Sequence, residues 1–277
     1  MTFKDIKVHV DNDSACSKRL EISINLAASF KAHLTCVYVR QSFPFPAYSN
    51  GKTSADVLEA YNKGLDEQES KCSALFDEVI HQHDTTVTWR SLTGSLSFEL
   101  VNETRYSDLL VLGQPSLDDG LTLNDGVADE IIVSAGRPCL IIPHECNCIE
   151  FGRSPLIAWD GSREASRAIQ GALPLLKQAD KITVLIVEPE KLNTAFGDEP
   201  DVMISEYLAR HGLNITVEIS RGSLQNIGDT ILTHAYAYGH DLIVMGAFGN
   251  ARWHEIMLDG ATRTIMKSAK MPVLMSH

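Results

Sequence analysis

The stretch Asp241–Met275 reads DLIVMGAFGNARWHEIMLDGATRTIMKSAKMPVLM and carries the clearest structural signal in this chain. It opens with a short apolar run, Leu242–Met245, which predicts a strand buried on both faces. Gly246 and Gly249 follow in a loop, and Gly260 precedes a segment with helical periodicity. A strand, a glycine loop and a helix N-terminus in this order can cradle an anion, although ordinary strand-to-helix turns give the same pattern.

The same series of features occurs twice along the chain, which indicates an internal duplication. Each half contains five short apolar runs rich in β-branched residues, with amphipathic segments between them. The matched runs are Ile6–Asp11 with Leu156–Asp160, His33–Val39 with Lys181–Val187, Thr86–Arg90 with Asn214–Ser220, Ser107–Gly113 with His240–Gly246, and Arg137–Ile141 with Met271–Met275.

This alternation predicts an α/β protein made of two repeated, doubly wound parallel sheets of Rossmann-like type. We expect residues 1–145 to form one domain and residues 153–277 the other. Doubly wound sheets bind ligands beyond the carboxyl ends of their strands, where the strand order reverses. In the second half the sequence places Asp160 and Gly246 at that edge. The irregular stretches 41–52 and 188–200 are either lids over this edge or solvated connections.

Length and composition limit the possible classes of partner and the cellular location. The length of 277 residues suits two domains of about 140 residues. A net charge of −12 argues against nucleic acid and anionic membranes as partners, because cations that could neutralise phosphates are outnumbered. No apolar run approaches the length of a membrane span, and a strand-like segment follows Met1–Asp5 directly. We therefore expect no signal peptide and a cytoplasmic location.

The six cysteines are scattered rather than spaced as a disulfide scaffold, so we expect reduced thiols. His144, Cys146 and Cys148 form an H-x-C-x-C cluster whose ligand types suit zinc. Its spacing matches no recognised zinc finger, and a fourth ligand would have to come from elsewhere, so metal binding stays open. The chain has no HExxH, GxSxG or Walker lysine motif, and the sequence predicts no catalytic residue.

The glycine loop resembles the nucleotide-binding signature of the universal stress protein family, G-x2-G-x9-G-[ST], which lies between the fourth strand and fourth helix of that fold. Gly246 and Gly249 match its first pair. The third position holds Asp259, and Gly260 with Ala261–Thr262 follows one place later. Family members often carry Gly-Gly-Ala-Thr here, so an acid replaces the first glycine. Its carboxylate would repel a triphosphate unless a metal ion lay between them.

The resemblance covers essentially the whole chain and implies an adenine-nucleotide-hydrolase-like fold in each half and a role in stress response. It implies that the second domain binds ATP or another adenine nucleotide, with Mg2+ as a companion ion. The residues implied are Asp160, Ile186, Val187, Gly246, Gly249, Gly260, Ala261 and Thr262. Two other interpretations stay open, in which Asp160 caps a helix and Ile186 and Val187 only fill the core.

The first half has a degenerate form of the signature. Ser116 stands where Gly249 stands in the second half, Pro115 removes a backbone N–H, and Asp118 adds negative charge. The resemblance therefore implies a structural role for this half, packed against the second through the last strands as the two chains of a family dimer pack. It leaves open whether two copies of the whole chain form a homodimer.

Two further interpretations belong to other functional classes. A scaffold or small-metabolite-binding module would keep the fold without a nucleotide, and Asp259 favours that alternative. Slow hydrolysis of ATP is the other. Arg252 and Trp253, between the glycines of the better loop, could contact a phosphate and a base or simply belong to a mobile loop or partner interface.

Overall fold

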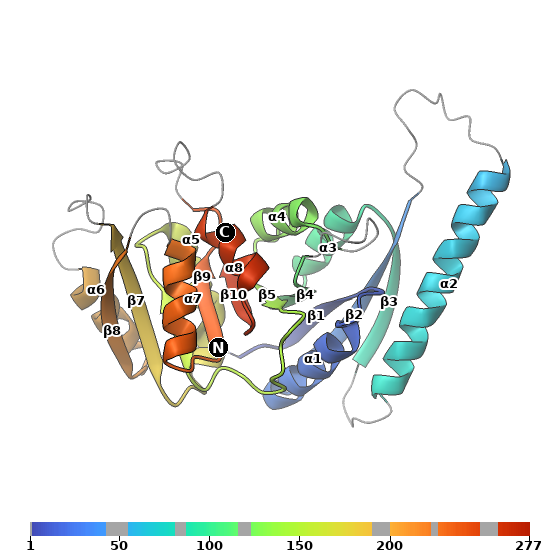
Figure 1. Ribbon diagram of the computed structural model, residues 1–277. Helices are drawn as coiled ribbons and strands as arrows, with labels where there is room; N and C mark the ends of the chain where they lie inside the picture. Colours follow the sequence, from blue (N-terminus) through green and yellow to red (C-terminus); the bar gives the residue numbers. More distant parts are fainter. Residues whose placement is uncertain are drawn as a thin grey trace.

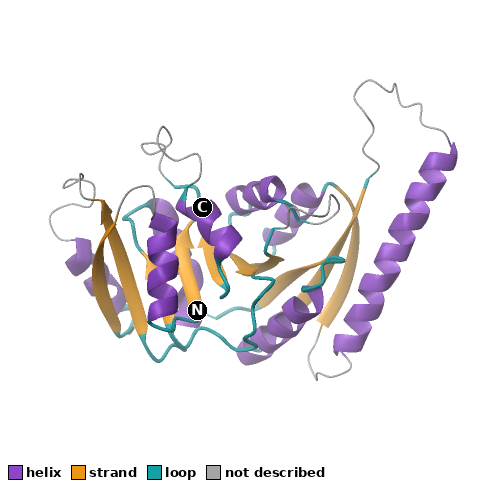
Figure 2. Cartoon of the chain, viewed as in Figure 1, coloured by secondary structure: helices purple, strands orange, loops and turns teal. Residues whose placement is uncertain are grey.

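The computed structural model describes residues 2–42, 55–80, 87–115, 123–189, 200–222, 227–249 and 260–277. Strands and helices alternate along the chain, and the second half repeats the order of the first (Figures 1 and 2). The first half contains β1 (Asp5–Val10), α1 (Cys16–Phe30), β2 (His33–Gln41), α2 (Ala55–Ile80), β3 (Val87–Gly94), α3 (Leu96–Thr104), β4 (Leu109–Gly113), α4 (Asp125–Ser134) and β5 (Cys139–Ile142). The second contains β6 (Pro155–Ala158), α5 (Arg163–Leu176), β7 (Ile182–Pro189), α6 (Pro200–Arg210), β8 (Ile215–Gly222), α7 (Ile227–Ala237), β9 (Leu242–Gly246), α8 (Ala261–Ser268) and β10 (Val273–Ser276).

All these strands join one 10-stranded sheet in the order β3-β2-β1-β4-β5-β10-β9-β6-β7-β8. Strand neighbours within each half are parallel, which confirms the predicted fold class. The halves meet where β5 and β10 pair antiparallel, with Ile141 opposite Val273 and Cys139 opposite Met275. The predicted contact through the last strands is therefore present, and it makes the two sheets continuous.

Helices cover both faces of this sheet because its strands are apolar on both sides. In β4 the side chains of Leu109 and Val111 enter one core, and those of Leu110 and Leu112 enter the other. The first core lies against α1, α2, α5 and α6, and the second against α3, α4, α7 and α8. Each core contains residues of both halves, so packing as well as strand pairing joins them.

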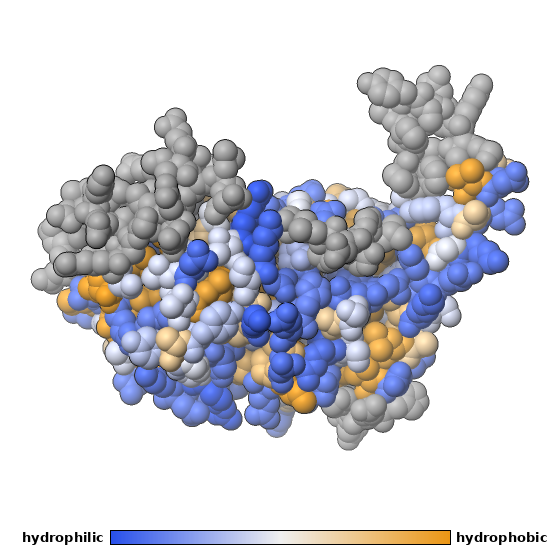
Figure 3. All heavy atoms as spheres, viewed as in Figure 1, coloured by the Kyte–Doolittle hydropathy of each residue, from blue (hydrophilic) through white to orange (hydrophobic). Residues whose placement is uncertain are grey.

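The surface agrees with this layered arrangement. In the described part of the face seen in Figure 3, hydrophobic residues form separate small areas, and hydrophilic residues lie over the middle of the molecule. None of the helices in the described ranges is both long enough and apolar enough to cross a bilayer.

Candidate functional site

The loops after β6 and β9 start side by side at the carboxyl edge of the sheet. Their register pairs Ala158 with Met245, so the chain leaves both strands at the same level. Strand β6 lies between β9 and β7, so the connection to β7 goes to one side and the later return to β9 goes to the other. Doubly wound sheets bind ligands at this reversal of strand order. We therefore take this edge of the second half as the candidate site.

Asp160 lies exposed in the loop after β6. Its Oδ1 accepts hydrogen bonds from the Ser162 backbone N–H at 3.0 Å and from Ser162 Oγ at 2.6 Å. Ser162 is the N-cap of α5, where its Oγ accepts a hydrogen bond from Ala165 N at 3.0 Å. Asp160 thus orients the cap residue instead of capping the helix itself. Among the described residues its Oδ2 has no hydrogen-bond partner, and this oxygen can accept from a ligand.

The backbone of β7 continues past the end of β6. The ladder between these strands ends where Ala158 meets Leu185, and Trp159 N donates to Leu185 O at 2.9 Å. Ile186 and Val187 come next, with 0% and 9% of their surfaces exposed, so their side chains are buried. Their backbone pairs with β8 on one side and extends beyond β6 on the other. A planar group such as a base could pair with that open backbone edge.

Gly246 ends β9 and packs against the first turn of α5. A Cβ at this position would lie 2.5 Å from the backbone nitrogen of Ala165 and 2.8 Å from the carbonyl carbon of Glu164. Only glycine lets the strand and helix approach this closely. Packing therefore accounts for Gly246 without a ligand, and its contact with a phosphate stays a prediction.

The β9 loop is fastened to the start of α8. The Phe248 backbone N–H donates to Thr262 Oγ1 at 3.2 Å, and Phe248 itself has a left-handed backbone with a φ of 52°. Helix α8 begins at Ala261, and Gly260 at the N-cap position has no side chain that could make a capping hydrogen bond. An uncapped helix start presents N–H groups and the positive end of the helix dipole. The structure thus joins the loop that holds Gly249 to Gly260, Ala261 and Thr262.

Sequence reasoning missed Glu164, a carboxylate beside the glycine loop. It is 4% exposed, and a Cβ on Gly249 would lie 3.0 Å from its Oε2. Burial raises its pKa, but hydrogen bonding and charge from Arg163 and the charge of His277 outweigh burial, so its pKa lies below the usual range. Glu164 is therefore an anion here. An acid in the first turn is common in helices, so its sequence signal was that of an ordinary helix start.

The equivalent edge of the first half is filled by a buried ion cluster. Arg19 is 1% exposed, and its Nη2 lies 2.6 Å from Oδ1 of Asp11, the counterpart of Asp160. Arg19 Nε donates to the carbonyl oxygen of His9 at 3.0 Å, and its Nη1 lies over Gly113 at the end of β4. Because Asp11 is buried and paired, it is not available to a ribose. This gives a physical reason for the expectation that the first half does not hold a nucleotide.

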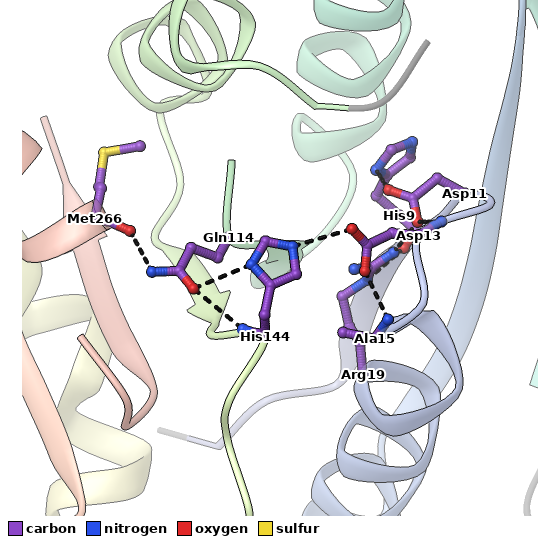
Figure 4. Close-up of polar contacts among 8 residues, drawn as sticks. All are labelled: His9, Asp11, Asp13, Ala15, Arg19, Gln114, His144 and Met266. Carbon is purple, nitrogen blue, oxygen red and sulfur yellow. Dashed lines mark hydrogen bonds and ion pairs between the residues drawn. The ribbon is translucent and has the colours of Figure 1, made fainter. Parts of the chain in front are cut away.

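The described residues give no support to a zinc site at His144, Cys146 and Cys148. No group of three His, Cys, Asp or Glu side chains in those ranges is placed to share a metal ion. The His144 ring faces the first half instead, with Nε2 3.0 Å from Asp13 Oδ2 and Nδ1 3.2 Å from Gln114 Oε1 (Figure 4).

Several sequence predictions fall outside the described residues. They concern Arg252, Trp253 and Asp259 in the second half, Ser116 and Asp118 in the first, and the segments 43–52 and 190–199 of the two irregular stretches.

Comparison with known proteins finds similarity to universal stress proteins. Residues 155–277 match the family model described as Universal stress protein family. A curated universal stress protein of Synechocystis is 25% identical over 151 residues, which are 53% of this chain and 49% of the relative. The chain therefore spans about half the length of that relative.

Solved structures show the same fold. A universal stress protein from Archaeoglobus fulgidus aligns with 98% of this chain and 95% of its own, at 15% identity and a TM-score of 0.72. A functionally unknown protein from Pseudomonas aeruginosa aligns with 99% of this chain and 92% of its own, at 14% identity and a TM-score of 0.59. A universal stress protein in complex with cAMP aligns with 52% of this chain and 99% of its own, at 17% identity and a TM-score of 0.34, which is too slight a likeness to bring its ligand here.

Proposed function

We propose that this chain, which belongs to the universal stress protein family, binds ATP or another adenine nucleotide at the carboxyl edge of β6, β7 and β9. The adenine would lie along the backbone of Ile186 and Val187, and the ribose would donate to Asp160 Oδ2. The phosphates would lie at the start of α8. A stress-response role and a cytoplasmic location rest on the family and the composition, and they stay predictions.

The glycine at the N-cap of α8 is the observation that carries this proposal. Gly260 provides no side chain to the first helical N–H groups, and Thr262 Oγ1 holds the β9 loop beside them. A phosphate oxygen is the kind of acceptor that such a helix start binds, because it meets both the N–H groups and the dipole. Gly249 in that loop has no side chain, so its backbone can approach a phosphate closely.

Magnesium would have a specific task at this edge. Glu164 is ionised beside Gly249, and two anions within a few ångströms repel strongly where water is excluded. A divalent cation bound by phosphate oxygens would offset the charge of Glu164. We therefore expect nucleotide binding to weaken when Mg2+ is chelated.

The first test is to purify the full chain without added nucleotide, denature it and separate what is released. Calorimetric titration with Mg-ATP then compares the chain with its Asp160→Asn variant. The amide keeps an oxygen acceptor for Ser162 but removes the free carboxylate oxygen. We expect Asp160→Asn to weaken binding about tenfold or more, since a hydrogen bond to a charged group contributes about 1.5–3 kcal/mol.

The matched control is Asp180→Asn. Asp180 precedes β7, so it lies at the opposite edge of the sheet, and its side chain is 77% exposed. Affinity should be unchanged in this variant. An empty chain that also fails to bind millimolar Mg-ATP would rule out the nucleotide site, and equal losses in both variants would rule out a role for Asp160.

The second candidate function is a scaffold or small-metabolite module, and Glu164 is the observation that favours it. A buried anion beside the loop suits an uncharged or cationic ligand better than a polyphosphate. In that case Mg-ATP would not bind, and the Glu164→Gln variant would not gain affinity for it.

A further inference from the structure

Two thiols face each other in the connection between β5 and β6. Cys146 Sγ and Cys148 Sγ lie 2.9 Å apart, and both cysteines are free. Two sulfur atoms at this separation need to approach by less than about 1 Å to reach the length of a disulfide bond. The backbone of this connection therefore already holds the pair close to bonding geometry.

The segment around the thiols is fixed on both sides. His144 Nε2 lies 3.0 Å from Asp13 Oδ2 of the first half, and Glu145 Oε2 lies 2.8 Å from Lys270 Nζ of the second. Cys146 N donates to Pro143 O at 3.1 Å and closes a tight turn. These contacts hold the connection against both halves, so the approach of the two sulfur atoms is part of the folded structure.

The pair differs electrostatically from the other cysteines. The hydrogen bond from Cys148 lowers the pKa of the Cys146 thiol to about 7 against the effect of burial, and the charge of Lys18 adds to the lowering. The hydrogen bond to Cys146 and burial raise the pKa of Cys148, so Cys148 keeps its proton. Burial also raises the pKa of Cys72 and Cys139, each to about 12. A thiolate is the reactive form of cysteine, so Cys146 is the nucleophile of the pair.

We propose that Cys146 and Cys148 form a redox site that hydrogen peroxide converts to an intramolecular disulfide and that a thiol reductant restores. Cys146 is 3% exposed, and Cys148 beside it is half-buried, so an oxidant close to water in size suits the site. The disulfide would lie in the segment that joins the two halves. No residue of the proposed nucleotide site takes part.

The chemistry balances without any group from elsewhere in the chain. The Cys146 thiolate attacks one peroxide oxygen and becomes a sulfenic acid, and the other oxygen leaves as hydroxide and takes up a proton to form water. The sulfur of Cys148 then attacks the sulfur of Cys146, gives up its thiol proton and displaces the sulfenic oxygen as a second water. Two thiols are oxidised, and one hydrogen peroxide is reduced to two waters.

The test uses the full reduced chain at pH 7 with a chelator and a few equivalents of hydrogen peroxide. After quenching and alkylation, cleavage behind Glu145 and Glu150 releases the peptide Cys146–Glu150, which holds both thiols. We expect this peptide to be unalkylated and lighter by two hydrogens, and a reductant should restore it. In Cys148→Ser, Cys146 should stop at the sulfenic acid, which dimedone traps.

Two comparisons decide whether the fold creates the site. The control variant Cys72→Ala removes a buried thiol on α2 and should leave the reaction unchanged. The chain unfolded in guanidinium should react about tenfold more slowly, because an ordinary thiol at pH 7 is only a few per cent thiolate. The proposal is overturned if the unfolded chain forms the bond equally fast, if another cysteine oxidises first, or if the bond links two molecules.

Discussion

At the scale of single residues, the two glycines of the β9 loop differ in what surrounds them. Gly246 faces the backbone of Ala165 and Glu164 in the first turn of α5, whereas among the described residues Gly249 faces the side chain of Glu164, with the carboxylate Oε2 nearest. Backbone atoms cannot move without displacing the helix, but a carboxylate end can rotate away. Gly246 is therefore required for the packing of β9 against α5, whereas a larger residue can be accommodated at position 249.

We predict that Gly246→Ala lowers the free energy of unfolding by about 1–3 kcal/mol, the usual range for an overpacked core position. Gly249→Ala is the matched control, and its change should stay within about 0.5 kcal/mol. Urea unfolding followed by circular dichroism measures both. Equal losses in the two variants would contradict this difference in packing.

His9 makes stability depend on pH. Burial lowers its pKa from 6.5 to about 4, against the charge of Asp11, with Arg19 adding to the lowering. Between these pH values the unfolded chain binds a proton at His9 that the folded chain does not, so its contribution to stability falls as the pH falls. The free energy of unfolding changes through His9 by at most about 1.4 kcal/mol per pH unit, and this change ends below about pH 4.

We predict that His9→Gln removes this part of the slope. Urea unfolding at a series of pH values between 7 and 4 measures it. His211→Gln is the control, because its half-buried ring packs on Tyr207 at the end of α6, away from this cluster. Identical slopes in the chain and in His9→Gln would show that His9 does not cause the loss.

At the scale of elements, one side chain of the first half holds the end of a helix in the second. Gln114 Nε2 donates to the Met266 carbonyl in the last turn of α8 at 2.7 Å (Figure 4). Its Oε1 accepts from His144 N at 3.1 Å. The amide thus satisfies a helix carbonyl, a group that helix ends leave unpaired, and it orders the β5–β6 connection at the same time.

We predict that Gln114→Ala lowers the free energy of unfolding by about 1–3 kcal/mol, because it leaves partners on both halves unpaired. Gln170→Ala is the control, since that exposed amide donates, among the described residues, only to the hydroxyl of Tyr207, at 2.7 Å. Its change should stay within about 0.5 kcal/mol. A loss in Gln114→Ala no larger than in Gln170→Ala would show that the bond does not stabilise the junction.

The elements themselves were predictable from the sequence, and these contacts were not. Apolar runs such as Leu109–Gly113 read as buried strands because both faces of the sheet are covered. The sequence repeat correctly predicted that Asp160 follows a strand. By contrast, Gln114 and Met266 are 152 residues apart, and the approaches of Glu164 to Gly249 and of Arg19 to Gly113 arise only in the folded chain. Local periodicity does not indicate such pairs. The residues that make up the two strand-end sites could therefore be identified only from the structure.

At the scale of the whole molecule, the halves share a sheet and two cores. Strands β5 and β10 pair, with Leu140 opposite Leu274, and each core contains residues from both halves. Domains connected by a flexible linker unfold separately, whereas elements in a shared core unfold together. This arrangement favours one cooperative unit, even though the sequence repeat suggests the two domains 1–145 and 153–277.

We predict that Leu34→Ala in β2, remote from the junction, destabilises both halves. Leu34 is 0% exposed, and truncating a buried leucine costs about 2–5 kcal/mol. Hydrogen exchange measured by mass spectrometry should then show faster exchange by the same factor, about thirtyfold or more, in peptides from β1 and from β6. Met203→Ala on α6, a residue 70% exposed, should change neither. Faster exchange confined to the first half would mean that the halves unfold separately, and the repeat would then mark two independent domains despite their common sheet.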